Sequence, residues 1–576
     1  MKADPFRREL RARLQQHSSE VLLRILVAGD RSVELTGGDI LRESLRLASL
    51  ATAPAGRVVL LLLPHSVELF LLHVGLVLTK RIPAILPWPT RRVNPEKYQR
   101  NLLHQLRHLP AEELITTPRL ASGLGSRLPY PVVACGIEDA KAQEEVVSMS
   151  LRLCGEDGPP AAHTPFQDPG EALFLQFSGG TTGLQKSVVI TAPILTSQLG
   201  SLRESLRFSS ADVVVSWLPL YHDMGLIACL WLPLWHAASS VQLAAQDWLL
   251  DAGLLFRSLE RHRGTFCWLP NFAFSYLAAQ RHRMAGPYSL AHVRAYIDCS
   301  EPVRLRSIRE FAAAFADWGV NPQQVQASYA MAENVFAATQ TQLGRKPSTI
   351  PRTALRKAED PASPAFALAD EVFVSSGRPI GGVQVRIVTP QGQACAEREP
   401  GEIQLATESL FSGYWGSQGF TTNTFTRDRW YATGDYGFLA DGELYVIGRL
   451  RDIVIAGGQN IFPEDVEDIV SAVPGVYAGR TVAFGIANAY DTESLIVVAE
   501  MKGAYDTDRA AVLEKEIAGI LLTAVGIAPE RVWVVPERWI LKSTAGKISR
   551  RETRERYLRE RAQKPQSRVA VVGADR

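Results

Sequence analysis

The chain has 576 residues, of which 46% are hydrophobic and 21% charged, with 62 Lys and Arg against 60 Asp and Glu. These values are typical of a folded protein with several structural units and exclude a disordered chain. The formal net charge of +2 gives no long-range attraction to nucleic acid or to an anionic membrane, so neither is expected as a partner. The charge is uneven, however, because residues 547–576 hold ten Lys or Arg and four Asp or Glu.

Cysteine usage and the first residues indicate a reducing compartment. The six cysteines, none in a Cys-x-x-Cys pair, are Cys135, Cys154, Cys229, Cys267, Cys299 and Cys395. Such scatter predicts neither a disulfide framework nor a zinc site. The opening sequence MKADPFRRELRARLQQ is charged and lacks the apolar core of a signal peptide. We therefore expect a cytoplasmic location.

The first 160 residues alternate between strand and helix patterns. Residues 57–64 (RVVLLLLP) form a short apolar run, residues 66–80 have apolar positions at helical spacing, and residues 81–86 (RIPAIL) read as the next strand. This order predicts a parallel sheet with helices on its faces. Residues 155–170 are rich in Gly and Pro and are expected to be a linker, after which the alternation resumes.

One uncharged segment is long enough to cross a membrane. Residues 224–246 contain no acidic or basic side chain, but they include Pro233, His236 and several Ser and Gln residues. We interpret the segment as a buried helix followed by a strand, and expect no membrane span.

The pattern of the sequence changes twice in the second half of the chain. The proline-rich residues 341–371 are expected to be a surface insertion or crossing, and residues 383–447 contain short alternating runs typical of a small β-barrel or antiparallel sheet. Beyond Asp452 strands and helices return, ending in a basic helix at residues 549–561. The last residues, 563–576, have weak periodicity and are expected to be a frayed tail.

The most informative motif is a Gly-rich loop that follows an apolar strand. Residues 173–191 read LFLQFSGGTTGLQKSVVIT. Three glycines allow a tight turn that brings backbone N–H groups close to an anion, while hydroxyl groups and Lys186 add further donors. The loop therefore predicts phosphate binding, although its spacing is not that of the P-loop nucleotidases.

Two further motifs have ordinary structural explanations as well as functional ones. In WLPLYHDMGL (residues 217–226), His222 and Asp223 could act on a substrate, or Asp223 could simply cap a helix. In ASYAMAEN (residues 327–334), Tyr329 could lie under a base with Glu333 near a metal, or the two could merely be one helical turn apart.

The last two motifs contain candidate ribose and phosphate ligands. YATGD (residues 431–435) ends in Asp435, DGEL (residues 441–444) predicts a hairpin turn, and Arg449 and Arg451 suit pairing with phosphate or carboxylate. ILKSTAGKISR (residues 540–550) presents Lys547 after a flexible Ser-Thr-Ala-Gly loop. A mobile catalytic lysine would need such a loop, but a solvated lysine before a basic helix would look the same.

The five motifs, taken in order, resemble the adenylate-forming superfamily over residues 30–555. The resemblance implies an α/β fold: a large N-terminal domain (residues 1–450) with two parallel-type α/β sheet subdomains and a small β-barrel, then a small mobile α+β lid (residues 451–562) and the tail. It also implies two half-reactions. A carboxylate first attacks the α-phosphate of ATP with Mg²⁺, giving acyl-AMP and pyrophosphate. A thiol then attacks the mixed anhydride and releases AMP.

The resemblance assigns roles to individual residues. Lys547 would bridge the carboxylate and the α-phosphate, Glu333 and Thr181 would bind Mg²⁺, His222 would lie beside the reacting carboxylate, and Arg451 would be the hinge. The residues implied in nucleotide binding are Ser178, Gly179, Gly180, Thr181, Thr182, Gly183, Lys186, Ser300, Glu301, Pro302, Ser328, Tyr329, Asp435 and Arg449. Those expected around the acid are Trp217, His222, Asp223, Met224, Trp268, Asn271 and Phe272.

The thiol acceptor stays open between an acyl-carrier protein and CoA. WLPLYHDMGLI, CWLPNFAFSYL, SEPV and SSGRPIGGVQVRIV look like fatty acyl-AMP ligases, which transfer the acyl group to the phosphopantetheine of an acyl-carrier protein. The loop FSGGTTGLQKS departs from their pattern at Gly180 and Gln185, and IAGGQNIFPEDVE (residues 455–467) resembles the CoA-synthetase form. The identity of the acid is equally open, although the aromatic residues favour an apolar one.

Several features of the sequence also allow other interpretations. Arg550, Arg551, Arg554 and Arg556 could dock an acidic carrier protein or meet CoA phosphates, or could pair with glutamates of their own helix. A non-catalytic nucleotide-binding relative is disfavoured because Glu333, Asp435 and Lys547 are all present. An adenylating enzyme with a non-thiol nucleophile remains an alternative, and we expect a monomer or a weak homodimer.

Overall fold

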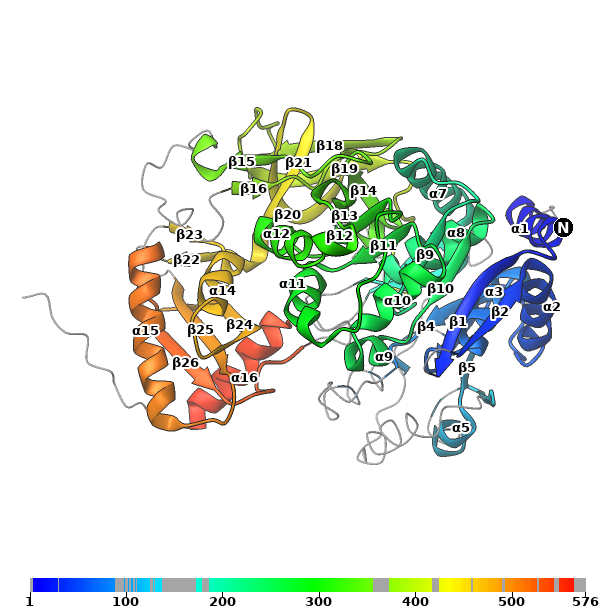
Figure 1. Ribbon diagram of the computed structural model, residues 1–576, viewed down its shortest axis with the longest axis horizontal. Helices are drawn as coiled ribbons and strands as arrows, with labels where there is room; N and C mark the ends of the chain where they lie inside the picture. The colour runs from blue at the N-terminus through cyan, green and yellow to red at the C-terminus, as the bar shows by residue number, and fades with distance from the viewer. Residues whose placement is uncertain are drawn as a thin grey trace, which may run out of the picture. The chain divides into compact units, whose positions relative to one another are not determined.

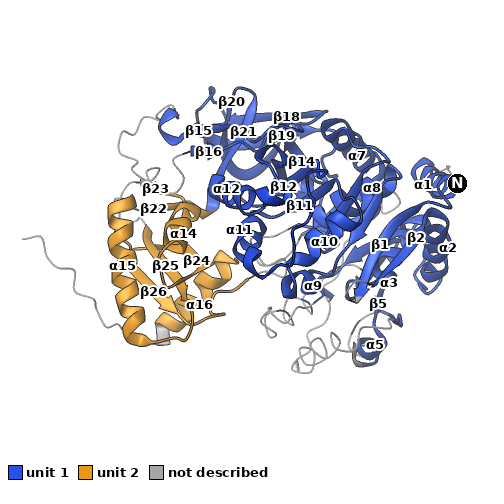
Figure 2. Cartoon of the chain, viewed as in Figure 1, with its two compact units in different colours: residues 1–180, 184–361, 370–451 blue, residues 181–183, 362–369, 452–576 orange. Residues whose placement is uncertain are grey.

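The structure is a computed structural model with two compact units (Figures 1 and 2). Described residues up to Arg451 belong to unit 1, and described residues from Asp452 onward belong to unit 2. The structure describes residues 4–28, 31–88, 111–124, 130–136, 172–178, 186–355, 372–416, 424–456, 459–488, 493–525, 528–542 and 548–563, and positions 98, 102, 105, 106, 109 and 128.

Unit 1 contains a six-stranded sheet built from the predicted N-terminal alternation. Its order is β6 (Val132–Ala134), β5 (Glu113–Thr116), β3 (Val58–Leu62), β4 (Ile82–Ile85), β7 (Ala172–Phe177) and β8 (Ser187–Thr191). All neighbours are parallel except β7 and β8, which form an antiparallel hairpin. Between β3 and β4 lies α3 (Val67–Leu78), whose start is capped by the Ser66 hydroxyl. The strand–helix–strand prediction for residues 57–86 is confirmed.

A second, nine-stranded sheet supplies most of the candidate site. Its order is β17 (Arg378–Pro379), β14 (Ala337–Gln340), β13 (Val325–Ala330), β12 (Ala295–Cys299), β11 (Phe266–Leu269), β9 (Val213–Ser216), β10 (Ser239–Gln242), β1 (Val21–Ala28) and β2 (Arg31–Thr36). The strands from β13 to β1 run parallel, and β2, β14 and β17 are antiparallel to their neighbours.

Helices pack on this sheet through aromatic side chains. Phe311 of α12 (Leu305–Ala314) contacts Phe256 of α10 (Gly253–Arg261), Phe274 of α11 (Asn271–Gln280) and Tyr296 of β12. These contacts place the three helices on the face of the sheet that carries Tyr296. The other α-helices in the described part of unit 1 are α1 (Pro5–Gln16), α2 (Gly37–Ala48), α5 (Pro118–Leu124), α7 (Ala192–Leu206), α8 (Leu232–Trp235) and α9 (Ala245–Leu250).

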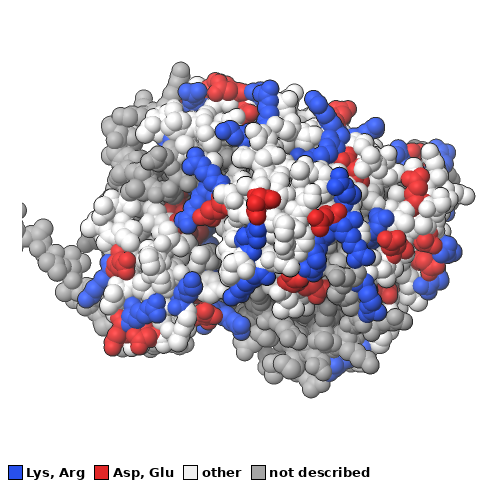
Figure 3. Space-filling view, viewed as in Figure 1, with Lys and Arg blue, Asp and Glu red and all other residues white. Residues whose placement is uncertain are grey.

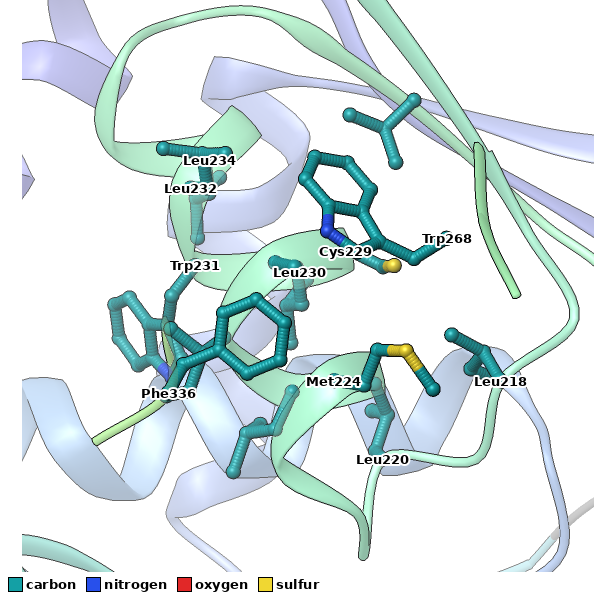
Figure 4. Close-up of a cluster of buried hydrophobic side chains, with 14 of the residues drawn as sticks. Leu218, Leu220, Met224, Cys229, Leu230, Trp231, Leu232, Leu234, Trp268 and Phe336 are labelled. Carbon is teal, nitrogen blue, oxygen red and sulfur yellow. The ribbon is translucent and has the colours of Figure 1, made fainter. Parts of the chain in front are cut away.

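The uncharged segment at residues 224–246 is a core element. It forms the π-helix η1 (Met224–Trp231), then α8 and β10, and all eight residues of η1 are buried. Met224, Cys229 and Trp231 pack in the cluster shown in Figure 4. Gly225 lies so close to Pro219 that a Cβ there would be 2.3 Å from the carbonyl oxygen. The buried helix-and-strand prediction is confirmed, and the helices of the described residues include none that could span a membrane.

The predicted antiparallel region forms a four-stranded sheet in the order β18 (Val383–Val388), β19 (Gly401–Thr407), β20 (Tyr431–Ala440) and β21 (Glu443–Arg449). The DGEL motif is the turn between the last two strands, and Asp441 and Gly442 both have positive φ, as this two-residue hairpin requires. In the predicted crossing at residues 341–371, of which the structure describes 341–355, β15 (Thr349–Pro351) pairs with β16 (Val372–Val374).

Unit 2 is a small α+β unit. Its sheet has the order β24 (Val476–Ala487), β25 (Glu493–Met501) and β26 (Arg531–Val535), and a separate hairpin joins β22 (Val454–Ala456) to β23 (Gln459–Ile461). Its helices are α14 (Pro463–Ser471), α15 (Thr507–Val525) and α16 (Arg550–Gln563). Leu513, Ile517 and Leu521 of α15 lie four residues apart and are buried in its core. The α/β fold class, with its parallel sheets and small C-terminal unit, is confirmed.

Candidate active site

The base of the Gly-rich loop is the β7–β8 hairpin. Phe177 pairs with Ser187, and the Ser178 N–H donates to the Lys186 carbonyl at 2.9 Å. The loop between them contains the predicted phosphate ligands Gly179, Gly180, Thr181, Thr182 and Gly183, which lie outside the described residues. Its two ends are therefore fixed to a buried sheet, which is how a phosphate loop is usually presented.

A short segment pairs with β8 and supplies a residue that the sequence analysis missed. Val188 pairs with Tyr414, and the Trp415 N–H donates to the Ser187 carbonyl at 2.7 Å. The Tyr414 hydroxyl donates to Glu333 Oε1 at 2.8 Å, and the Lys186 ammonium lies 4.7 Å from the centre of the Tyr414 ring. Tyr414 thus joins two predicted site residues, a role that the FSGYWG sequence did not indicate.

Glu333 lies in the turn η5 (Ala332–Asn334), which follows β13. The helical explanation for the Tyr329–Glu333 spacing is therefore wrong, because Tyr329 is on a strand and Glu333 is in the turn after it. Burial raises the pKa of Glu333, while the Tyr414 hydrogen bond lowers it and the charge of Asp223 raises it. Burial lowers the pKa of Lys186, and the Glu333 charge opposes that shift.

Tyr329, Asp435 and Arg449 form a second cluster. Asp435 and Arg449 are cross-strand partners on β20 and β21, with Arg449 Nε 3.1 Å from Asp435 Oδ1. The Tyr329 hydroxyl donates to Asp435 Oδ2 at 2.6 Å. This hydrogen bond links the nine-stranded sheet to the antiparallel sheet. Ser328, predicted beside Tyr329, instead donates its hydroxyl to the Thr339 carbonyl within the sheet.

The residues after β12 meet the start of α11. Ser300 has a φ of 73°, and Glu301 Oε2 accepts the Phe272 N–H at 2.9 Å. The side-chain Oδ1 of Asn271 accepts the Arg304 N–H at 3.2 Å. Glu301, which lies between Ser300 and Pro302, therefore contacts the first turn of α11 at Phe272, and Asn271 contacts the backbone of Arg304.

His222 and Asp223 lie at the start of η1. Asp223 Oδ1 accepts the Met224 N–H at 2.8 Å and lies 2.6 Å from His222 Nδ1. The capping interpretation of Asp223 is confirmed. Since the Asp223 charge also acts on Glu333, the capped helix start lies near that carboxylate.

The predicted acid-binding residues fall into two groups. Trp217 stacks on Trp248 at 3.9 Å and contacts the ring of Phe272, which is 37% exposed. Trp217, Trp268 and Met224 are all buried in the same core cluster, and the last two lie beside Leu218 (Figure 4). The structure thus places Trp268 and Met224 in the core packing.

The candidate hinge and catalytic lysine are described only in part. Arg451 lies in the turn η8 (Leu450–Asp452) at the end of unit 1. Lys547 lies outside the described residues, but the base of its loop is fixed because Lys542 pairs with Ile548.

The arginines of α16 have partners within unit 2. Arg550 pairs with Asp452, Glu464 and Glu467, and Arg551 pairs with Glu555. Arg554 donates to the Gly485 carbonyl and Arg556 to the Trp539 carbonyl. Arg551 and Arg556 pair with glutamates of their own helix, as one interpretation expected, whereas Arg550 and Arg554 have partners elsewhere in unit 2. In Figure 3, basic and acidic residues are interspersed on the face shown.

The carboxylate of Glu333 suits a magnesium ion that substrate phosphates also coordinate. It suits less well a metal ion that protein side chains alone would coordinate. The described residues contain no group of three or more His, Cys, Asp or Glu side chains that could hold a metal. Mg²⁺ is usually held by one or two carboxylates together with substrate phosphates. Glu333 accepts a hydrogen bond at Oε1 from Tyr414 and lies near the base of the Gly-rich loop, so it can serve as such a ligand.

Comparisons with known proteins agree with this arrangement. A sequence profile of the family described as "AMP-binding enzyme" matches residues 10–415. A long-chain-fatty-acid–AMP ligase of Mycolicibacterium smegmatis is 30% identical over 68% of this chain and 69% of its own length. A 4-hydroxyphenylalkanoate adenylyltransferase of Mycobacterium tuberculosis is 27% identical over 88% of this chain and 83% of its own length.

Among solved structures, one from a study of fatty acyl-adenylate ligases of E. coli and L. pneumophila superposes with a TM-score of 0.77. It is 22% identical and covers 96% of this chain and 98% of its own. This likeness shows the fold and agrees with the two-sheet architecture.

Proposed function

Because the chain belongs to the AMP-binding enzyme family and is therefore a ligase, we propose that it joins ATP and an apolar carboxylic acid to give acyl-AMP and pyrophosphate. The observation that supports this proposal most directly is that two clusters of unit 1, Lys186 with Glu333 and Tyr329 with Asp435 and Arg449, lie close enough for the Arg449 charge to act on Glu333. These side chains offer cations for phosphates and carboxylates for a metal and for hydroxyl groups.

In this proposal the protein positions its substrates and neutralises charge. Adenylyl transfer needs the acid carboxylate aligned with the α-phosphate, and no side chain acts as nucleophile. Tyr329 stacks on the adenine, Asp435 and Arg449 bind the ribose, and the Gly-rich loop with Lys186 holds the β- and γ-phosphates. His222 lies beside the acid carboxylate. Glu333 and Thr181 would hold Mg²⁺, which would screen the phosphate charge when bound.

The second half-reaction transfers the acyl group to a phosphopantetheine thiol. We favour an acyl-carrier protein as the acceptor because the sequence motifs around residues 217–227 and 375–388 look like those of fatty acyl-AMP ligases. Free CoA and a non-thiol nucleophile are the alternatives. Relatives named for long-chain fatty acids and 4-hydroxyphenylalkanoates support a long, largely apolar acid.

Acid-dependent ATP–pyrophosphate exchange tests the first half-reaction, and Lys547→Ala tests the proposed catalytic lysine. We expect this substitution to lower the exchange rate by roughly 100- to 1,000-fold, as expected for loss of one group that stabilises transition-state charge. ATP binding should be nearly unchanged. Lys542→Ala is the matched control, because Lys542 lies at the base of the same loop.

Two results would contradict these assignments. Near-normal exchange by the Lys547→Ala variant would exclude a catalytic role for Lys547. Exchange in the absence of any acid would exclude the proposed activation of a carboxylic acid. Incubating the acyl-AMP with holo-carrier protein, CoA or hydroxylamine then identifies the acceptor, and transfer to CoA alone would overturn our choice.

A further inference from the structure

The Asp298 carboxyl group is a buried polar group that the proposed reaction does not use. Asp298 is 0% exposed, and neither of its oxygens has a hydrogen-bond partner among the described residues. Leaving a buried polar group without a partner costs free energy, so such groups are rare in folded proteins unless a ligand or water completes them.

The register of the sheet places Asp298 beside the candidate active site. Asp298 pairs with Leu269 of β11 and with Ala327 of β13, near the carboxyl ends of three parallel strands. Tyr329, the proposed adenine contact, lies two residues beyond Ala327 and therefore on the same face. Ligands of open parallel sheets bind outside these strand ends.

Two other polar groups without partners accompany Asp298. The Tyr296 hydroxyl lies on the same face of β12, two residues earlier, and has no partner among the described residues. The same holds for the indole N–H of Trp217. Trp217 contacts the ring of Phe272, whose N–H is bound by Glu301, and the charge of Glu301 acts on Asp298. A few polar groups in an otherwise apolar wall are typical of sites that orient a ligand.

The surroundings of Asp298 favour a neutral ligand group. Burial and the nearby Glu301 charge both raise the pKa of Asp298 well above its ordinary value. Both effects favour the protonated form of the carboxyl group, which can both accept and donate a hydrogen bond. A hydroxyl group has the same capacity, whereas an ammonium group would require an ionised partner.

We propose that Asp298 is a specificity-determining residue that hydrogen-bonds a hydroxyl group of the acid substrate, remote from the reacting carboxylate. This inference rests on the proposed function and names the substrate class: hydroxylated apolar acids. Because Asp298 has no exposed surface, the acid must displace neighbouring side chains to reach it.

Matched pairs of acids test this inference in ATP–pyrophosphate exchange by the whole chain. The pairs are phenylpropanoate with its para-hydroxy derivative and octanoate with its omega-hydroxy derivative. We expect the native chain to prefer the hydroxylated member of at least one pair by roughly 10- to 100-fold in kcat/KM, because an unmatched acid leaves the site's polar groups unpaired.

Two substitutions of Asp298 distinguish an effect on acid preference from an effect on protein stability. Asp298→Leu should abolish the preference by losing activity on the hydroxylated acid alone, and should keep or raise Tm because a buried unpartnered group is removed. Asp298→Asn, which still hydrogen-bonds, should keep the preference.

Equal activity of the native chain on both members of each pair would overturn the inference and leave the proposed function intact. So would an equal loss on both members in the Asp298→Leu variant. Exchange with no acid would overturn both proposals together.

Discussion

Arg550 of unit 2 and Arg449 of unit 1 both pair with carboxylates, but in different surroundings. Arg550 has only 17% of its side chain exposed and contacts Asp452, Glu464 and Glu467 at 2.6 to 3.1 Å. Arg449 has 43% of its side chain exposed, and the ion pair described for it is the one with Asp435. The first arginine is enclosed by its partners, while the second presents much of its surface to solvent.

The pKa shifts in the cluster of Arg550 with Asp452, Glu464 and Glu467 indicate a structural role. Burial raises the pKa of Glu467 to about 7, although the Arg550 charge lowers it and the Glu464 charge raises it. Burial lowers the pKa of Arg550, but the three carboxylates more than reverse this shift. Three ionised carboxylates this close together repel one another, and the single guanidinium compensates that repulsion. The cluster therefore fixes α16 within unit 2, whereas the exposed Arg449 suits a ligand.

The difference predicts that removing Arg550 destabilises unit 2 far more than removing an exposed arginine of the same helix. Arg550→Ala leaves buried carboxylates without their cation and should cost about 3–5 kcal/mol in the free energy of unfolding. Hydrogen exchange of α14 and α16 in the whole chain measures this. Arg551→Ala is the matched control, because its exposed pair with Glu555 should contribute less than about 1 kcal/mol. Equal protection in the two variants would show that Arg550 is not structural.

At Asp435, in contrast to Arg550, we expect a substitution to weaken ATP binding and to leave stability nearly unchanged. Asp435→Asn keeps an acceptor for the Tyr329 hydroxyl but removes the charge beside Arg449 and a proposed ribose ligand. We expect the KM for ATP to rise by roughly 10- to 100-fold, with little change in Tm. The control is Asp428→Asn, which breaks the exposed pair with Arg386. A large loss of Tm with an unchanged KM would place Asp435 with the structural cluster instead.

The smallest effect on activity is expected from a substitution of Tyr414. Tyr414→Phe removes the hydrogen bond to Glu333 but keeps the ring beside Lys186. The Mg²⁺ concentration for half-maximal exchange should rise by roughly 3- to 10-fold at nearly constant kcat, since one hydrogen bond to a charged group is lost. The Tyr436→Phe variant removes a hydroxyl 3.4 Å from the Pro400 carbonyl and should leave this concentration unchanged. A fall in kcat alone would contradict the positioning role.

Local patterns predicted the elements well because they depend on neighbouring residues. The apolar run at residues 57–64, the helix that follows it, and the Asp441–Gly442 turn were all recognisable from periodicity and from turn chemistry. The same approach could not distinguish a helix from a strand and turn at Tyr329 and Glu333, because a spacing of four fits both. It also could not identify Tyr414, whose importance comes from pairing with Val188 and Glu333, both far away in sequence.

The sequence by itself determined the fold class, the membership of the AMP-binding family and the order of the candidate site motifs. The tertiary structure decided which members of those motifs meet. It placed Trp268 and Met224 in the core, enclosed Arg550 among three carboxylates, and left the Asp298 oxygens without partners among the described residues. The physical reason is that periodicity records which face of an element is buried, whereas partnership and solvation depend on chain segments that only folding brings together.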